Sequence, residues 1–276
     1  MGNPLFLENS EISIIHPLDY GVHSIVINEN VSATPRSAMY PLLLLPGLMN
    51  DARVWQSVVR EIEHERTCVV FPTHQEEGVE NIAAAAIRTM PPGPFCVAGF
   101  SLGGYVALEV FRQATDRIKG LALLSTGSRS ESESGKAFRQ RMIDAARSGS
   151  NNFASAAQSF LPRVLHPNHL GEAAITSVLT DMARSVGSDG FIRQQLTAIH
   201  RPDSLSTLEQ VHVPALVLCG AEDQIAPATL SKEMAQTIQD VELVILPDCG
   251  HMVTLEQPGG TVAAMRHWLQ RSDSAF

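Results

Sequence analysis

The stretch Gly-Phe-Ser-Leu-Gly at residues 99–103 decides how this sequence is interpreted. It follows an apolar run at residues 95–98 that is typical of a buried strand, and it precedes a helix-like stretch at residues 105–111. A serine in such a tight turn needs a strained backbone to lift its hydroxyl clear of the sheet, and its neighbours must be almost free of side chain. The glycines at both ends of the stretch, with Gly104, meet that need. The pattern predicts that Ser101 is a nucleophile.

Two later loops supply the acid and the base that such a serine needs. The apolar run at residues 214–219 is typical of a buried parallel strand, and the loop after it contains Glu222 and Asp223. The next strand-like run, at residues 241–246, is followed by a loop that contains His251. Functional groups of open parallel sheets gather at the carboxyl ends of the strands. The serine, a carboxylate and the histidine are therefore expected to meet at one edge of the sheet.

Along the chain the serine comes first, then the carboxylate and then the histidine. With this order, the three loops resemble those of the lid-bearing bacterial carboxylesterases of the α/β-hydrolase fold. The resemblance covers residues 40–125 and 205–272. It implies an α/β fold with a mostly parallel central sheet and helices on both faces, and the alternation of strand-like and helix-like stretches agrees with this. It also implies a helical cap inserted after the sixth strand. We therefore expect a core of residues 1–127 and 207–276 and a cap of residues 128–206.

The resemblance assigns a role to each member of the proposed triad. Ser101 becomes the nucleophile, His251 the general base and acid, and Asp223 the carboxylate that orients the imidazole. Glu222 remains the alternative for the third role, with a solvated loop charge as its other interpretation. Asp223 is favoured because the acid of this family usually lies just before a short segment that ends in proline, here Pro227.

The loop after the apolar run at residues 42–45 is the expected partner of the serine turn in binding a negatively charged oxygen. In the family, one such amide comes from this loop and the other from the residue after the nucleophile. By position these are the backbone N–H groups of Leu48 and Leu102. The family more often has His-Gly where this chain has Pro46-Gly47. Because the donor is a backbone amide, this departure leaves the predicted function of the loop in place.

Between residues 125 and 206 the alternation stops, and helical patterns broken by glycine and proline take over. The caps of this family shape the substrate pocket. Large apolar residues here, among them Phe160 and Met182, are candidate substrate contacts, with the cap's own core as the alternative interpretation. Met49 and Trp55, which follow the apolar run at residues 42–45, are further candidates. Because the triad and both amides come from the core, we expect changes in the cap to alter selectivity and to leave the chemistry unchanged.

Three polar features near these motifs have two interpretations each. The run Arg193-Gln194-Gln195 and the polar residues 200–204, near the return to the core, form either a substrate clamp or a structural salt bridge. His74 faces either the site or the surface. Cys249, two residues before His251, either packs beneath the loop or takes part in its chemistry.

Composition excludes several other classes of protein. The chain has 276 residues, 44% of them hydrophobic, which is enough for one large core. Its net charge of −9 and the lack of a basic cluster argue against nucleic acid as a partner. The sequence offers no window of about 18 apolar residues for a membrane span. We also expect no metal, because the histidines and cysteines lack metal-ligand spacing.

The four cysteines favour a cytoplasmic location. Cys68, Cys96 and Cys219 fall in strand-like runs, where a free thiol behaves as a small buried hydrophobe. The first residues lack a basic segment followed by a long apolar one, so we expect no secretory signal. A hairpin of residues 10–16 and 22–28 is expected before the core.

The resemblance therefore implies a serine hydrolase that cleaves the carboxylic ester of a small or medium acyl substrate through an acyl-enzyme, without a cofactor. The same triad supports hydrolysis of a lactone, a thioester or a carbon–carbon bond, and these remain alternatives. A ligand-binding receptor that retains the triad is a further alternative from a different class. Turnover of a simple ester distinguishes an enzyme from a receptor.

Overall fold

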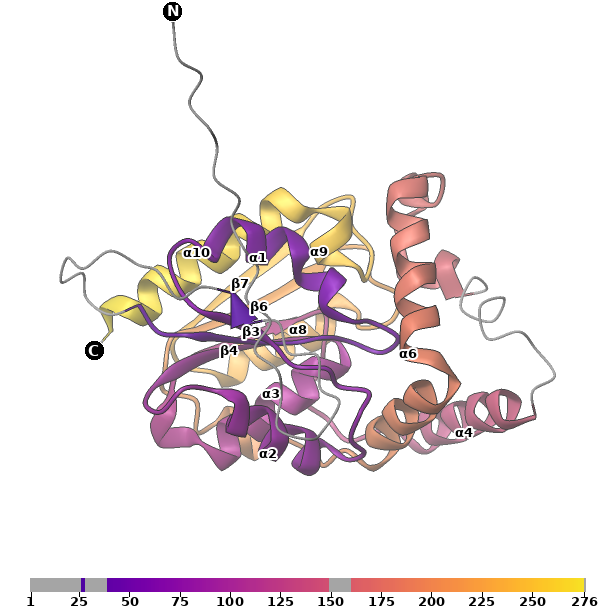
Figure 1. Ribbon diagram of the computed structural model, residues 1–276, viewed down its shortest axis with the longest axis horizontal. Coiled ribbons are helices and arrows are strands. Elements are labelled where there is room, and N and C mark those ends of the chain that lie inside the picture. Colours follow the sequence, from indigo (N-terminus) through magenta and orange to yellow (C-terminus); the bar gives the residue numbers. More distant parts are fainter. Residues whose placement is uncertain (1–25, 28–38, 149–159, 276) are drawn as a thin grey trace, which may run out of the picture.

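A seven-stranded sheet forms the centre of the molecule (Figure 1). The computed structural model describes residues 26–27, 39–148 and 160–275. The strands lie in the order β1-β3-β2-β4-β5-β6-β7, with β1 antiparallel to β3 and all other neighbours parallel. Their bounds are β1 Val26–Ile27, β2 Leu42–Leu45, β3 Cys68–Val70, β4 Phe95–Phe100, β5 Ile118–Leu124, β6 Ala215–Gly220 and β7 Val241–Leu246. The predicted mostly parallel sheet is confirmed.

Helices cover both faces of this sheet (Figure 1). One face packs against α1 (Gln56–Ile62), α9 (Val253–Glu256) and α10 (Pro258–Ser274). The other packs against α2 (Val79–Thr89), α3 (Leu102–Gln113), α7 (Leu205–Leu208) and α8 (Ala228–Thr237). The predicted three-layer arrangement is therefore confirmed.

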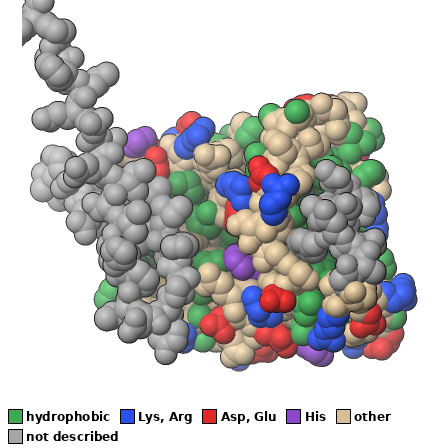
Figure 2. Space-filling view, turned by 45° about the vertical axis from the view of Figure 1, so that its right-hand side comes forward, with side chains coloured by type: hydrophobic (Ala, Val, Ile, Leu, Met, Phe, Trp, Pro, Cys, Tyr) green, Lys and Arg blue, Asp and Glu red, His purple; other side chains and the backbone are tan. Residues whose placement is uncertain are grey.

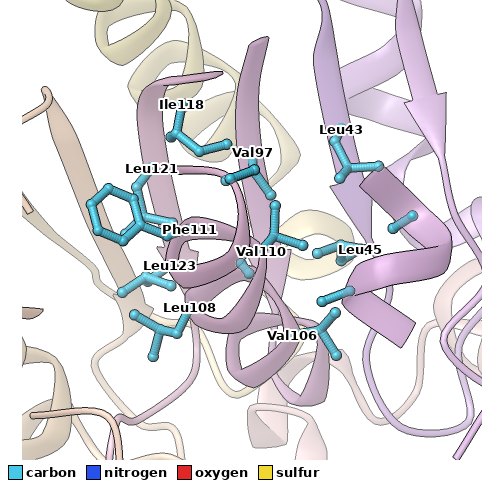
Figure 3. Close-up of a cluster of buried hydrophobic side chains, with 14 of the residues drawn as sticks. Leu43, Leu45, Val97, Val106, Leu108, Val110, Phe111, Ile118, Leu121 and Leu123 are labelled. Atoms are coloured by element: carbon cyan, nitrogen blue, oxygen red, sulfur yellow. The ribbon is translucent and has the colours of Figure 1, made fainter. Parts of the chain in front are cut away.

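Two hydrophobic cores, one on each face, account for the unbroken apolar run of β2. Successive side chains of a strand point to opposite faces. Leu43 and Leu45 accordingly pack in the first core, on the side of α3, which also contains Val106 and Val110 of that helix (Figure 3). Leu42 and Leu44 pack in the second core, on the side of α1 and α10. Because both faces of a parallel sheet are covered, its central strands lose the polar alternation of a half-exposed strand.

The segment between β5 and β6 is helical, and five strands precede it in the described residues. It contains α4 (Glu133–Arg147), a helical turn at residues 160–164, a 3-10 turn at Pro167–His169 and α6 (Ala173–His200). The φ of Gly187 is 68°, which divides α6 into two helical parts. In Figure 1, α4 and α6 lie together beside the sheet. We keep the name cap for residues 128–206, and their standing as a separate domain remains a prediction.

Two arginines fix the ends of the cap to each other and to the core. Glu131 accepts hydrogen bonds from Arg139 (2.6 Å) and Arg201 (2.9 Å). Burial raises the pKa of Glu131, but the hydrogen bonds from the two arginines outweigh it and bring the pKa to about 2. The guanidinium of Arg201 also lies 4.2 Å from the centre of the Tyr105 ring on α3. These contacts favour the salt-bridge interpretation for Arg201.

Two expectations concern the start of the chain. The first arm of the expected hairpin, residues 10–16, lies outside the described residues. Of the second arm, residues 22–28, only Val26–Ile27 is described, and it forms β1. In the described part of the chain, no helix combines the length and the apolarity that crossing a membrane requires.

Candidate active site

Ser101 lies at the turn between β4 and α3, in a strained backbone conformation. Its φ of 53° and ψ of −118° are unusual for a residue with a side chain. The turn also brings α3 very close to the sheet. A Cβ on Gly103 would lie 2.1 Å from the Leu45 carbonyl oxygen, and one on Gly99 would lie 2.2 Å from the Gly103 oxygen. Glycine is therefore required at both positions, as the sequence pattern indicated.

His251 is held at both ring nitrogens. Its Nε2 lies 2.9 Å from the Oγ of Ser101, and its Nδ1 lies 2.8 Å from the Oδ2 of Asp223. The other carboxylate oxygen of Asp223 accepts the backbone N–H groups of Ile225 (2.8 Å) and Ala226 (2.9 Å). Both Asp223 and His251 are buried. A carboxylate at Nδ1 selects the tautomer whose free Nε2 accepts a proton from the serine hydroxyl.

The neighbouring carboxylate, Glu222, points elsewhere. Its Oε2 accepts the backbone N–H of Cys249 at 3.0 Å, and its side chain is exposed. Of the two acidic residues in this loop, Asp223 is thus the one hydrogen-bonded to the imidazole. Cys249 itself is fully buried, and this burial raises the pKa of its thiol far above the ordinary value. A neutral, buried thiol fits the packing interpretation of Cys249.

A buried carboxylate that the sequence analysis did not single out fixes the histidine loop. Glu256 is 5% exposed and accepts three backbone N–H groups. Its Oε1 binds Met252 (2.9 Å), and its Oε2 binds Gly250 (3.1 Å) and His166 (2.6 Å). The first two flank the imidazole, and the third belongs to the cap. The available signal was a single acidic residue at the end of the mostly apolar stretch that follows the histidine.

The two amides predicted to bind a negatively charged oxygen belong to neighbouring turns. Leu102 is the first residue of α3, where the helix dipole favours negative charge. Leu48 lies in the turn after β2. Within the described residues, the N–H groups of both leucines have no hydrogen-bond partner. The next residue, Met49, has a φ of 57°, so this loop is strained as well. No described residue therefore occupies either donor, and the role of both amides remains a prediction.

A small apolar cavity of about 50 Å³ lies beside the turn after β2 and the loop that contains His251. Two of the residues that line it, Met49 and Met252, directly follow Leu48 and His251 in the sequence. The cap supplies most of the others. The lining residues are Met49, Asn50, Phe160, Leu161, Val164, Leu179, Thr180, Ala183 and Met252.

The four candidate substrate contacts lie in two kinds of surroundings. Trp55 and Met182 are fully buried in the second hydrophobic core and do not line the cavity. The cap shares this core with the sheet, and its large apolar side chains are used there for packing. These positions fit packing in the core, and a substrate role for either residue remains a prediction. Met49 and Phe160 do line the cavity.

His74 packs against α6, and it is not among the residues that line the cavity. A Cβ on Gly190 of that helix would lie 3.2 Å from the Cβ of His74. Burial lowers the pKa of His74, which favours the neutral form of its ring. Its carbonyl oxygen accepts the Nε of Arg193 at 2.8 Å. His74 and Arg193 therefore join the core loop after β3 to the cap.

Charges of both signs lie next to one another on the face that Figure 2 turns forward. Among the described residues, no group of three or more histidine, cysteine, aspartate or glutamate side chains is placed to hold a metal ion.

Residues 42–265 match the model of the Alpha/beta hydrolase family, and the chain belongs to this family. The prediction of a hydrolase is confirmed at this level. A curated relative, the pimeloyl-[acyl-carrier protein] methyl ester esterase of Nitrosospira multiformis, is 27% identical over 80% of this chain and 91% of its own length. The protein of the same name from Neisseria meningitidis serogroup B is also 27% identical, over 69% of this chain and 75% of its own.

Solved structures share the whole fold. A thermophilic esterase from Thermogutta terrifontis superposes with a TM-score of 0.79 and 26% identity, over 92% of this chain and 94% of its own. The enol-lactonase of Burkholderia xenovorans also gives a TM-score of 0.79, over 90% of this chain and 96% of its own. Its 20% identity makes this a likeness of fold alone.

Replacing Glu256 by glutamine should destabilise the histidine loop. The amide keeps one acceptor oxygen, but it places an NH₂ group against backbone N–H donors and removes the charge that strengthens their hydrogen bonds. We expect the free energy of unfolding in urea to fall by about 1.5–3 kcal/mol. Glu222→Gln, an exposed carboxylate with one backbone contact, is the matched control and should change it by less than about 0.5 kcal/mol. Equal losses in the two variants would contradict the anchoring role of Glu256.

Proposed function

We propose that this protein hydrolyses the carboxylic ester of a small or medium acyl substrate, with Ser101 as the nucleophile. The observation that carries the proposal is the continuous hydrogen-bonded chain from the Ser101 hydroxyl through His251 to Asp223. Membership of the Alpha/beta hydrolase family and the likeness to esterases support it.

In the first half of the proposed reaction, the Oγ of Ser101 attacks the ester carbonyl carbon while its proton passes to Nε2 of His251. The carbonyl electron pair moves onto its oxygen, which then carries a negative charge. The N–H groups of Leu48 and Leu102 donate to that oxygen. When the carbonyl re-forms, the bond to the alkoxide breaks, and the alkoxide leaves as an alcohol with the proton from His251. The acyl group remains on Ser101.

In the second half, a water molecule attacks the acyl carbon and gives its proton to Nε2 of His251. The same two amides hold the oxyanion. Its collapse breaks the bond to Ser101, whose oxygen recovers the proton from the imidazole, and a carboxylic acid is released. Asp223 stays ionised throughout and stabilises the imidazolium that forms in each half. These steps need no cofactor.

The cavity beside the turn after β2 and the histidine loop is the proposed substrate site. Its lining is mostly apolar, which suits a hydrocarbon group, and Met49 and Phe160 are the proposed substrate contacts. We infer that the cap, residues 128–206, acts as the lid, because its side chains form much of this lining. The four cysteines are free and buried, which supports the inference of a reducing, cytoplasmic location.

The likeness to pimeloyl-[acyl-carrier protein] methyl ester esterases favours a methyl ester as the bond that is cleaved. Lactone, thioester and carbon–carbon bond hydrolysis remain the alternatives on the same triad, and a non-catalytic receptor is the alternative outside enzymes. A panel of p-nitrophenyl and methyl esters of rising chain length, run beside lactones and thioesters, distinguishes them. The highest kcat/KM should fall on an ester. No turnover of any substrate would favour the receptor.

The same panel tests the two kinds of apolar residue in the cap. Phe160→Ala should change the chain-length preference of kcat/KM by about 10- to 100-fold, because a lost pocket contact is worth about 1–3 kcal/mol of discrimination. Met182→Ala removes a core side chain and should instead lower the free energy of unfolding by about 2–5 kcal/mol. A flat preference in Phe160→Ala would place the substrate elsewhere.

Ser101→Ala should abolish covalent labelling by a fluorophosphonate and lower kcat by about 10³-fold or more. The reason is that the variant lacks the hydroxyl that is hydrogen-bonded to Nε2 of His251. Mass spectrometry of the labelled protein identifies the modified residue. Labelling of another serine in the variant would contradict the assignment.

Asp223→Asn should leave the fold intact and lower kcat by about 10²- to 10⁴-fold, because an amide no longer selects the productive tautomer of His251. Glu222→Gln is the matched control, one residue away, and should keep most of the activity because its contact is to the Cys249 backbone. Ester kinetics on both variants make the comparison. The reverse order of effects would transfer the role to Glu222.

A further inference from the structure

We infer that Gln194, a residue of the cap, is a positioning residue for the backbone N–H of Leu48. Gln194 lies in the second part of α6, and its side chain is fully buried. A buried carboxamide is costly unless its polar atoms are hydrogen-bonded. The partners that satisfy it all belong to core loops: Gly47 and Met49 in the turn after β2, and Thr73 in the loop after β3.

The contacts of Gln194 grip the peptide groups on both sides of Leu48. Its Nε2 donates to the carbonyl oxygen of Gly47 at 3.2 Å. Its Oε1 accepts the N–H of Met49 at 2.9 Å. One carboxamide thus fixes the peptide groups that precede and follow the predicted donor.

The first of these contacts acts directly on the Leu48 donor. The Gly47 carbonyl and the Leu48 N–H belong to the same peptide group, which is planar and trans, so they point in opposite directions. A hydrogen bond that fixes the Gly47 oxygen therefore also fixes the direction of the Leu48 N–H. Donation to the carbonyl also polarises the peptide and makes its N–H a stronger donor.

The second contact holds a strained residue in place. Met49 has a φ of 57°, a conformation that persists only where surrounding structure enforces it. Thr73 completes the network, because its buried hydroxyl accepts from the Nε2 of Gln194 at 3.0 Å and donates to the Pro46 oxygen at 3.1 Å. The loop after β2 is thus held by hydrogen bonds to Pro46, Gly47 and Met49, on both sides of Leu48.

This arrangement revises one expectation from the sequence. Changes in the cap were expected to leave the chemistry unchanged, because the triad and both amides come from the core. Gln194 makes the cap part of the framework that directs a core amide. For Gln194, neither of the two interpretations of the Arg193-Gln194-Gln195 run applies. Its amide is instead hydrogen-bonded to a core loop, which it orients.

The chain provides a matched control in the next residue. Gln195 is also buried, at 2% exposure, but its Oε1 accepts from Arg139 of α4, inside the cap. Gln194→Met and Gln195→Met remove the same carboxamide from adjacent buried positions while keeping the length of the side chain. Only the first removes contacts to the loop that contains Leu48.

The test compares ester kinetics and inhibition by a trifluoromethyl ketone in these two variants, and it rests on the proposed function. Removing an oxyanion donor outright costs about 10²- to 10³-fold in kcat, so misdirecting one in Gln194→Met should lower kcat by about 10- to 100-fold. KM should stay within about threefold, because the lost interaction belongs to the transition state. The ketone forms a serine adduct that carries an oxyanion, so its Ki should rise by about the factor by which kcat/KM falls.

Gln195→Met should keep kcat within about threefold of the wild type. Unchanged kcat in Gln194→Met, or equal losses in both variants, would overturn the inference. If Gln194→Met does not fold, Thr73→Val decides by the same criteria, because it removes one partner of the Gln194 amide with little change of volume. Failure of the proposed function looks different: the wild-type protein itself would then neither turn over esters nor react with a fluorophosphonate.

Discussion

The imidazole of His251 joins two groups that are far apart in sequence, and the rest of the site depends on those two hydrogen bonds. Ser101 lies 150 residues before it and Asp223 lies 28 residues before it. Each partner is itself fixed, the serine by a strained turn between β4 and α3 and the aspartate by two backbone amides. Pre-organised groups of this kind need no rearrangement when the proposed reaction begins, which is the main source of electrostatic catalysis.

Two buried side chains join the cap to this framework. Glu256 accepts the backbone N–H groups of Gly250 and Met252 in the histidine loop and that of His166 in the cap. Gln194, from the cap, reaches in the other direction, to the turn that contains Leu48. The cap also shares a hydrophobic core with the sheet. The cap was expected to affect only selectivity. These contacts tie it to two of the loops that the proposed reaction uses, the histidine loop and the turn after β2.

The sequence was sufficient to predict the parallel sheet with helices on both faces and the residues that meet at its edge. Parallel strands leave unbroken apolar runs, and a serine turn against a strand leaves glycines, so both features can be recognised locally. The burial of Trp55 and Met182 could not be recognised locally, because an apolar residue in a core and one in a pocket have the same sequence pattern. Glu256 and Gln194 were missed as anchors for a related reason: the partners of a buried polar group are chosen by tertiary packing.

We expect the serine turn and the turn after β2 to form one site for a negatively charged oxygen. A crystal structure of the fluorophosphonate adduct measures this directly, because its phosphoryl oxygen stands where the oxyanion would be. We expect a phosphorus bonded to the Oγ of Ser101 and a phosphoryl oxygen within about 3.1 Å of the backbone nitrogens of Leu48 and Leu102. An adduct whose phosphoryl oxygen points away from both amides, or one formed on another residue, would contradict it.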